Sequence, residues 1–330
     1  MSIDLFYPEN RNRAKRVTEL VDDVSGMQNA IRDKTDQLDE ADARIVPLLN
    51  DLMRKYGLRT VDDLIERVVA EMPPKQEQGI RKILDDLDKT SANIEKSFGA
   101  VTSITLFAAA GGVSAKVIQL MKSNAIYVSA RLTMKAFTVA LRGGANALEE
   151  AGELFKAASK ASSTLSTSFE TTTSLGKALR FVKTAGKVLT ALGIVADVAL
   201  SVIAAVEGAK QRDELRKQIE ENFKRRVTVA FLTALASAAV SMNGNIESIL
   251  LLESMKGKDP KVDKNLQEAI DLLTEPIASS IEEMWDLVSY ENVAETWTNL
   301  DRNRGSWMDE DPSLKEVITE METEEEIDFT

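Results

Sequence analysis

The chain has 330 residues, a formal net charge of −12, and neither histidine nor cysteine. The missing imidazole and thiol groups exclude disulfides, the usual zinc sites and mechanisms that use a His base or a Cys nucleophile. We therefore expect no enzyme, no metal and no cofactor. An acidic chain is also poorly suited to nucleic acid, whose phosphates need a basic face. With only 5% aromatic residues and 7 prolines, the composition predicts an all-α fold.

The first helical pattern begins near Arg11 and continues for six heptads. Apolar residues seven positions apart form its stripe: Val17, Val24, Ile31, Leu38, Ile45 and Leu52. A stripe of this length predicts a long helix that packs along partner helices in an elongated bundle. Pro47 predicts a kink or break in this helix, and Gly57 predicts its end.

A short helix should follow, with Thr60 as its N-cap and Pro73-Pro74 as its end. A third helix is expected from about Lys75 to Ser97. We assign residues 1–97 to the stalk of the bundle.

Residues 98–158 differ from the stalk because they are both apolar and cationic. No Asp or Glu occurs from 99 to 148, and residues 99–206 carry a net charge of +6. Such a segment favours contact with an anionic membrane. We expect its five basic residues to bind lipid headgroups: Lys116, Lys122, Arg131, Lys135 and Arg142. Ala125–Leu141, which contains two of them, is predicted to be an amphipathic helix.

Two separated segments are apolar enough to be stored in a core and later to enter a bilayer. They are residues 98–121 and 188–206, each with one charged residue. The side chains expected to insert are Phe98, Val101, Ile104, Leu106, Phe107, Val113, Val117, Ile118 and Leu120 in the first segment. In the second they are Val188, Leu189, Leu192, Ile194, Val195, Val198, Leu200, Val202 and Ile203. Glycine pairs provide candidate hinges at Gly111, Gly112, Gly143 and Gly144.

Residues 159–176 are rich in Ser and Thr and predict a loop or a weak helix, which would serve as a joint. Residues 177–308 should hold the second apolar helix and the C-terminal stalk helices. One of these runs from Lys210 to about Met255, with apolar residues three or four apart. A break at Gly257 and Asp259-Pro260 precedes a last helix over about 261–300, kinked at Pro276.

Residues 309–330 carry a net charge of −9 and are predicted to form a flexible acidic tail. This tail could pair with the cationic middle of the chain and hold the soluble state.

Taken together, the layout resembles the α-helical pore-forming toxins typified by cytolysin A, haemolysin BL and the xenorhabdolysin-type binary toxins. In that resemblance the heptads of Val17–Leu52 and Leu215–Ile249 form the stalk, and residues 98–141 form the inserting head. It implies a protein that binds membranes, inserts apolar helices and oligomerises. The family pattern has one compact apolar hairpin, whereas this chain has two separated segments, so which of them inserts stays open.

The expected partners are therefore anionic membrane lipid and other copies of the chain, with or without a second protein component, and no nucleic acid. The N-terminus lacks the basic and apolar regions of a secretory signal peptide. We expect a soluble cytoplasmic product that reaches a membrane after release by another route. The alternative is a cytosolic helical scaffold, or a partner-binding protein, whose apolar helices stay buried.

Overall fold

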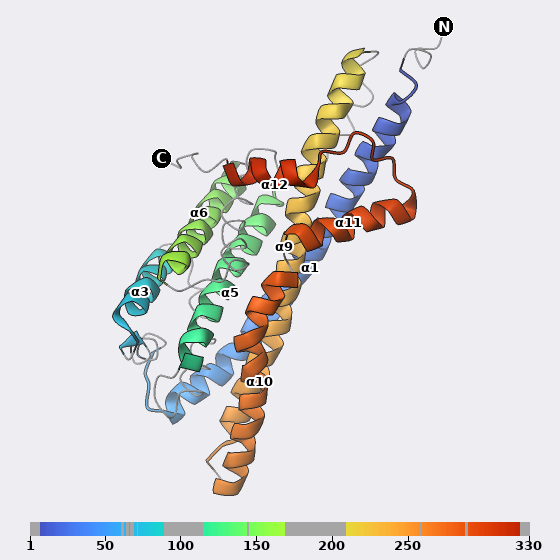
Figure 1. The fold of residues 1–330 in the computed structure, drawn as a ribbon. Helices are drawn as coiled ribbons and strands as arrows, with labels where there is room; N and C mark the ends of the chain where they lie inside the picture. Colours follow the sequence, from blue (N-terminus) through green and yellow to red (C-terminus); the bar gives the residue numbers. More distant parts are fainter. Residues whose placement is uncertain are drawn as a thin grey trace.

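A computed structural model describes residues 7–60, 63, 66, 69–70, 72–88, 115–143, 145–168, 209–257, 259–287 and 290–323. Every regular element in these ranges is an α-helix, which confirms the all-α elongated bundle. In chain order the helices are α1 (Asn10–Lys55), α3 (Pro74–Asp88), α5 (Ala115–Ala140), α6 (Ala145–Ser168), α9 (Ala209–Met255), α10 (Pro260–Leu287), α11 (Tyr290–Arg304) and α12 (Leu314–Thr323) (Figure 1).

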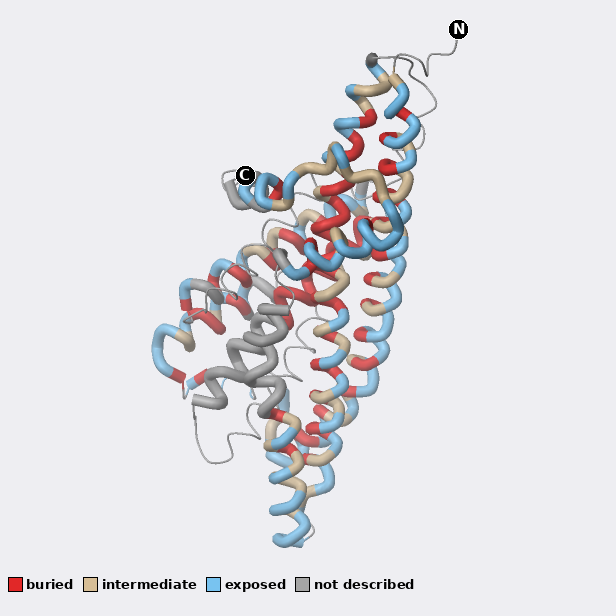
Figure 2. The backbone as a smooth tube through the Cα atoms, turned by 45° about the vertical axis from the view of Figure 1, so that its right-hand side comes forward, coloured by how far each residue is buried: buried red, intermediate tan, exposed pale blue. Residues whose placement is uncertain are grey.

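The two longest helices, α1 and α9, lie side by side in the same direction and form a rod (Figure 1). Their register is set near the start by Asn10, which donates to Gln211 at 3.2 Å, and further along by Arg44, which donates to Glu247 at 3.0 Å. All six predicted heptad residues of α1 are buried, as are the apolar residues predicted along α9. Figure 2 shows these buried positions facing each other along the rod.

Helix α1 continues through Pro47 and is not broken there. Pro47 and Ala43, whose carbonyl loses its helical donor, are both exposed, so water can satisfy that carbonyl. The predicted end of the helix is confirmed at Gly57, which has a φ of 69°. The Leu58 amide donates to the Met53 carbonyl at 2.8 Å, a hydrogen bond that closes a helix C-terminus.

The Thr60 cap is also confirmed. Its hydroxyl accepts from the Asp63 amide, and the Asp63 carboxylate accepts from the Thr60 amide, each at 3.0 Å.

The turn from α9 to α10 forms as the sequence predicts. Gly257 has a φ of 99°, and Asp259 accepts from the Lys261 amide at 2.8 Å, which caps α10. The prediction of one last helix over 261–300 is wrong, because α10 and α11 are separate elements. Helix α10 returns along α9 and continues past Pro276, whereas α11 crosses the rod (Figure 1).

Helices α5 and α6 form an antiparallel hairpin, with α3 against α6. Gly143, with a φ of 72°, turns the chain between them as expected. The amphipathic pattern predicted for α5 is wrong for residues 127–140, which are buried on nearly every side against α6, α9, α10 and α1.

The Ser/Thr-rich stretch is helical through Ser168, so the loop alternative fails for residues 159–168. The hydroxyls find partners inside the hairpin, which removes their usual tendency to compete with the helix. Ser129 of α5 donates to the Ala158 carbonyl at 3.1 Å and lies 2.6 Å from the Ser162 hydroxyl of α6. Residues 169–176, the remainder of the predicted joint, lie outside the described residues.

Gly79 marks the closest approach of α3 to α6. A β-carbon at this position would lie 2.4 Å from Cβ of Ser168, whereas one at Gly152 of α6 would meet nothing within 4 Å. Gly79→Ala should therefore lower the free energy of unfolding by about 1–3 kcal/mol. Gly152→Ala should raise it by about 0.5–1 kcal/mol, because alanine favours the helix. Chemical denaturation of the two variants tests this, and equal effects would contradict the contact.

Candidate functional site

A buried cluster of charged residues fastens α11 to the rod. At its centre is Asp301 of α11, whose side chain is 1% exposed. One of its oxygens, Oδ2, accepts from Arg16 of α1 at 2.7 Å. Both of its oxygens accept from Arg226 of α9, at 3.0 and 2.8 Å. Among the described residues, Arg16 and Arg226 are the largest side chains that are fully buried, so Asp301 neutralises two interior cations.

Further residues extend this arrangement, which we call the Asp301 network. Asp23 of α1 accepts from Arg304 at 2.7 Å and from Arg226 at 3.2 Å, and Arg304 also donates to Asp301 at 2.6 Å. The Arg226 guanidinium lies over the Trp297 ring, 5.4 Å from its centroid. The network therefore joins α1, α9 and α11 through paired charges and an aromatic contact.

The segment after α11 adds an outer layer to the network. Asp311 accepts from Arg16 at 2.9 Å. Glu310 accepts from Arg13 at 2.7 Å and from Arg216 at 2.7 Å, which joins the segment to both helices of the rod. Hydrogen bonds from these arginines lower the pKa of Glu310 to about 2. Residues 290–311 are thus held across the first part of the rod.

The two aspartates that bind Arg16 differ in their pKa. Burial opposes ionisation of Asp301, yet the hydrogen bonds from Arg16 and Arg226 outweigh it and hold the pKa of Asp301 well below its ordinary value. Burial outweighs the hydrogen bond from Arg16 at Asp311 and raises the pKa of that carboxyl. At neutral pH the central anion, Asp301, is fully ionised.

The prediction of a flexible acidic tail is wrong for residues 309–323. Glu310 and Asp311 are bound in the network, and 314–323 form α12. Glu310 and Asp311 also do not pair with the cationic middle of the chain, as was expected of the tail. Their partners lie on α1 and α9. The amino-acid composition could not predict these ion pairs, because Arg13 and Arg16 of α1 are separated from Glu310 and Asp311 by almost the whole chain. Residues 324–330 lie outside the described residues.

Helix α5 has its own polar attachment to the rod. Arg131, expected to bind lipid headgroups, is 9% exposed and donates to Asp39 of α1 at 3.2 Å and to Asp42 at a shorter distance. The hydroxyls of Thr35 and Thr138 lie 3.3 Å apart across the same contact. In this structure Arg131 therefore binds protein carboxylates and is not a free surface cation.

The other predicted site residues are placed only in part. Arg142 is exposed after the end of α5, and Lys135 is half-buried. The backbone of Lys116, Val117, Ile118, Leu120 and Lys122 belongs to α5, but their side chains lie outside the description. All other predicted inserting residues, and the hinges at Gly111, Gly112 and Gly144, lie outside the described residues.

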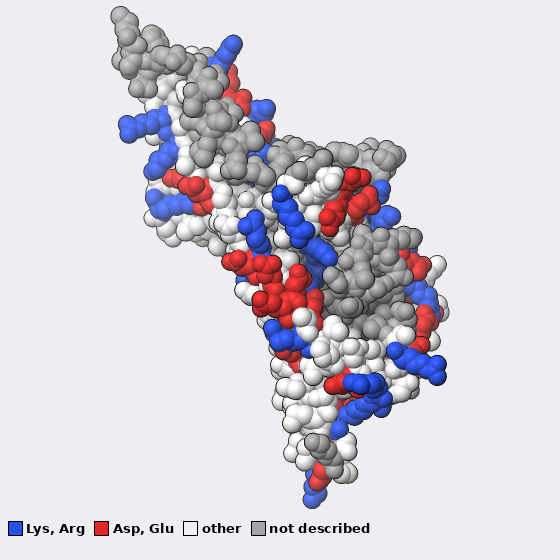
Figure 3. All heavy atoms as spheres, turned by 180° about the vertical axis from the view of Figure 1, so that it is seen from behind, with Lys and Arg blue, Asp and Glu red and all other residues white. Residues whose placement is uncertain are grey.

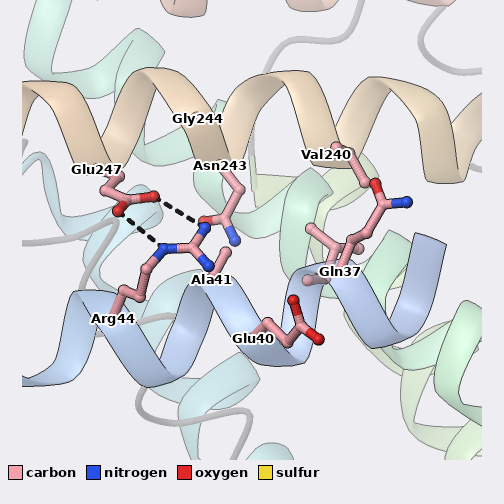
Figure 4. Close-up of a pocket in the computed structure, with 9 residues that line it drawn as sticks. Gln37, Glu40, Ala41, Arg44, Val240, Asn243, Gly244 and Glu247 are labelled. Atoms are coloured by element: carbon pink, nitrogen blue, oxygen red, sulfur yellow. Dashed lines mark hydrogen bonds and ion pairs between the residues drawn. The ribbon is translucent and has the colours of Figure 1, made fainter. Parts of the chain in front are cut away.

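A small pocket opens between the two helices of the rod (Figure 4). It measures about 230 Å³ and is lined by Gln37, Leu38, Glu40, Ala41, Arg44, Val240, Asn243, Gly244 and Glu247. Arg44 and Glu247 pair with each other across it. Its volume is below that of usual small-molecule sites, which are roughly 300–1,000 Å³. Among the described residues, no group of three or more acidic side chains is arranged to hold a metal ion.

No family model, curated protein or solved structure matches the chain. Within the described ranges, one helix, Lys210–Met255, is long and apolar enough to cross a membrane, and 61% of its apolar window is buried. A core helix of a soluble bundle passes the same test, so this helix does not decide between a membrane and a core.

Proposed function

We propose that this protein acts by a change of shape: it binds anionic membranes, inserts apolar helices and oligomerises into a pore. The observation that carries the proposal is the storage of α5 inside the bundle. Residues 127–140 are mostly apolar, nearly free of exposure and part of a stretch without acidic residues. A soluble-to-membrane switch needs such a helix held in the core before release.

The packing of α5 supports its release together with α6. Its contacts with α6 are far more extensive than those with α1, α9 or α10. The hairpin can therefore keep its internal contacts, such as Ser129–Ser162, while the contacts between Arg131 and α1 are broken. In a ring of such chains, neighbouring helices would cover the polar groups that lipid cannot satisfy.

A cytosolic helical scaffold is the second candidate, and the pairing of Arg131 favours it. A buried cation with two carboxylate partners is what a permanent core requires. In a scaffold the α5–α6 hairpin would never leave the rod.

Tethering the hairpin separates the two candidates. The chain has no cysteine, so pairs can be introduced cleanly. Thr35→Cys with Thr138→Cys would fasten α5 to α1, because the hydroxyls are 3.3 Å apart. Ser129→Cys with Ser162→Cys, 2.6 Å apart, would fasten α5 only to α6 and serves as the matched control.

The measurement is dye release from vesicles that contain phosphatidylserine. We expect release by the unmodified chain and by the oxidised Ser129/Ser162 control. The oxidised Thr35/Thr138 variant should release at least tenfold less dye and recover when its disulfide is reduced. No release by any form would favour the scaffold, and release by the oxidised Thr35/Thr138 variant would contradict the movement of α5.

A further inference from the structure

Among the described residues, one end of the rod gathers several of the large apolar side chains that are exposed. We call this region the hairpin end, and it is separate from the α5–α6 hairpin. It comprises residues 51–59 at the end of α1 and residues 251–264 at the turn from α9 to α10. Lys55 donates to the Glu253 and Lys256 carbonyls at 3.0 Å, and Tyr56 donates to the Glu253 carboxylate at 2.6 Å. These contacts hold the two segments together.

Seven large apolar residues are exposed in the described part of the chain, and four of them lie in the hairpin end. They are Tyr56, Leu251, Met255 and Val262, with exposed fractions between 40% and 51%. Leu251 and Met255 are one helical turn apart and so share a face of α9. Val262 continues the apolar pattern of α10, but it lies beyond the packed part of that helix. Clustering of this kind marks an interaction surface.

The charge of the hairpin end is opposite to that of the whole chain. Its two segments contain seven Lys or Arg and four Asp or Glu, a net charge of +3 within a chain of −12. The acids are engaged locally: Asp51 pairs with Arg54, Glu253 is buried, and Asp259 and Asp263 accept backbone N–H groups. Lys261 and Lys264 are exposed. Figure 3 shows a largely uncharged surface at this end, with basic and acidic side chains at its extremity.

The shape of this surface favours a bilayer as its partner. The turn forms an extremity of the elongated molecule, where it can enter a soft interface (Figure 1). Apolar side chains beside lysines suit the headgroup region, because the lysine stems can lie along the acyl boundary while their amines reach the phosphates. Arg131 of the predicted head is engaged with α1 and is therefore not free for a first contact with lipid.

We propose that the hairpin end is the docking surface through which the chain first binds an anionic lipid bilayer. The inference rests on the proposed function for the membrane itself, and it adds where contact begins. Docking by this end would place the rod end-on to the bilayer before the α5–α6 hairpin is released.

The test is cosedimentation with vesicles of phosphatidylcholine containing about 30% phosphatidylserine, beside vesicles of phosphatidylcholine alone. Leu251→Gln with Met255→Gln should weaken binding to the anionic vesicles by about tenfold or more. Lys261→Glu with Lys264→Glu should do the same by removing attraction to the headgroups. The matched control is Leu272→Gln with Leu300→Gln, two exposed apolar residues of α10 and α11 that lie outside both the hairpin end and the α5–α6 hairpin, which should bind as the unmodified chain does.

A direct readout uses Val262→Cys labelled with a polarity-sensitive dye, whose emission should shift to the blue on anionic vesicles. Unchanged binding by the Leu251/Met255 variant would overturn the proposal, as would equal binding to neutral vesicles. Absence of binding by the unmodified chain would overturn it in favour of a protein partner for this end. Binding through the hairpin end without dye release would support docking while contradicting the pore. Dye release that does not depend on the hairpin end would support the pore while contradicting docking by this end.

Discussion

Replacing Asp301 by alanine should lower the free energy of unfolding by about 3 kcal/mol. The substitution removes the anion that Arg16 and Arg226 share, although Arg16 keeps Asp311 and Glu19 as partners and Arg226 keeps Asp23. Those remaining partners place the cost at the lower end of the range for breaking a buried ion pair, roughly 3–5 kcal/mol. Because Asp301 is 1% exposed, water cannot take its place at the two guanidinium groups.

Urea denaturation followed by circular dichroism measures this loss. Limited proteolysis should also show earlier cleavage of residues 290–323, since α11 is the element that the network holds. Asp309→Ala is the matched control: it removes an exposed carboxylate in the same region and should change stability by less than about 0.5 kcal/mol. A loss below about 1 kcal/mol for Asp301→Ala would show that the network is not centred on this residue.

Phe137→Ala should cost about 3–5 kcal/mol, the largest effect that we expect from a single substitution. Phe137 is fully buried on α5, which packs against four other helices, so the surroundings cannot easily collapse into the space left by the ring. If α5 were an amphipathic surface helix, as its sequence predicts, the cost would be far smaller. The same denaturation experiment therefore tests whether α5 belongs to the core of the soluble state.

Leu148→Ala provides the comparison for Phe137→Ala. Leu148 lies on α6, 54% exposed, and its replacement should cost less than about 0.5 kcal/mol. Similar losses for the two variants would contradict the central position of α5. A large loss at Phe137 would also mean that release of α5 needs compensation from new contacts, which lipid and neighbouring chains would have to provide.

These positions show where sequence periodicity succeeded. Every heptad residue predicted in α1 is buried, because a long stripe of apolar residues can only be covered by a partner helix of similar length. The stripe of α9 succeeded for the same reason. The caps at Thr60 and Asp259 and the turn at Gly57 were also predictable, since each depends on residues within one helical turn.

Periodicity failed where burial on all sides or distant partners decided the outcome. Arg131 and Lys135 made residues 125–141 look amphipathic, yet the carboxylates of Asp39 and Asp42 allow Arg131 to be buried. The division between α10 and α11 had no strong local signal either. Val262 fits the apolar stripe of α10 but is exposed, because the helix begins beyond the part that its neighbours cover.

The acidity of the chain still argues against nucleic-acid binding, and its lack of His and Cys still excludes thiol and imidazole chemistry. Both are properties of composition alone and do not depend on the fold. The sequence by itself determined the all-α fold, the long helices α1 and α9, and the exclusion of thiol and imidazole chemistry. Only the tertiary structure decided which charges meet. It assigned Glu310 and Asp311 to arginines of the rod, and it left a cationic, apolar end on an acidic protein. The physical reason is range: helix formation depends on neighbours three or four residues away, whereas an ion pair depends on where the fold brings the two charges.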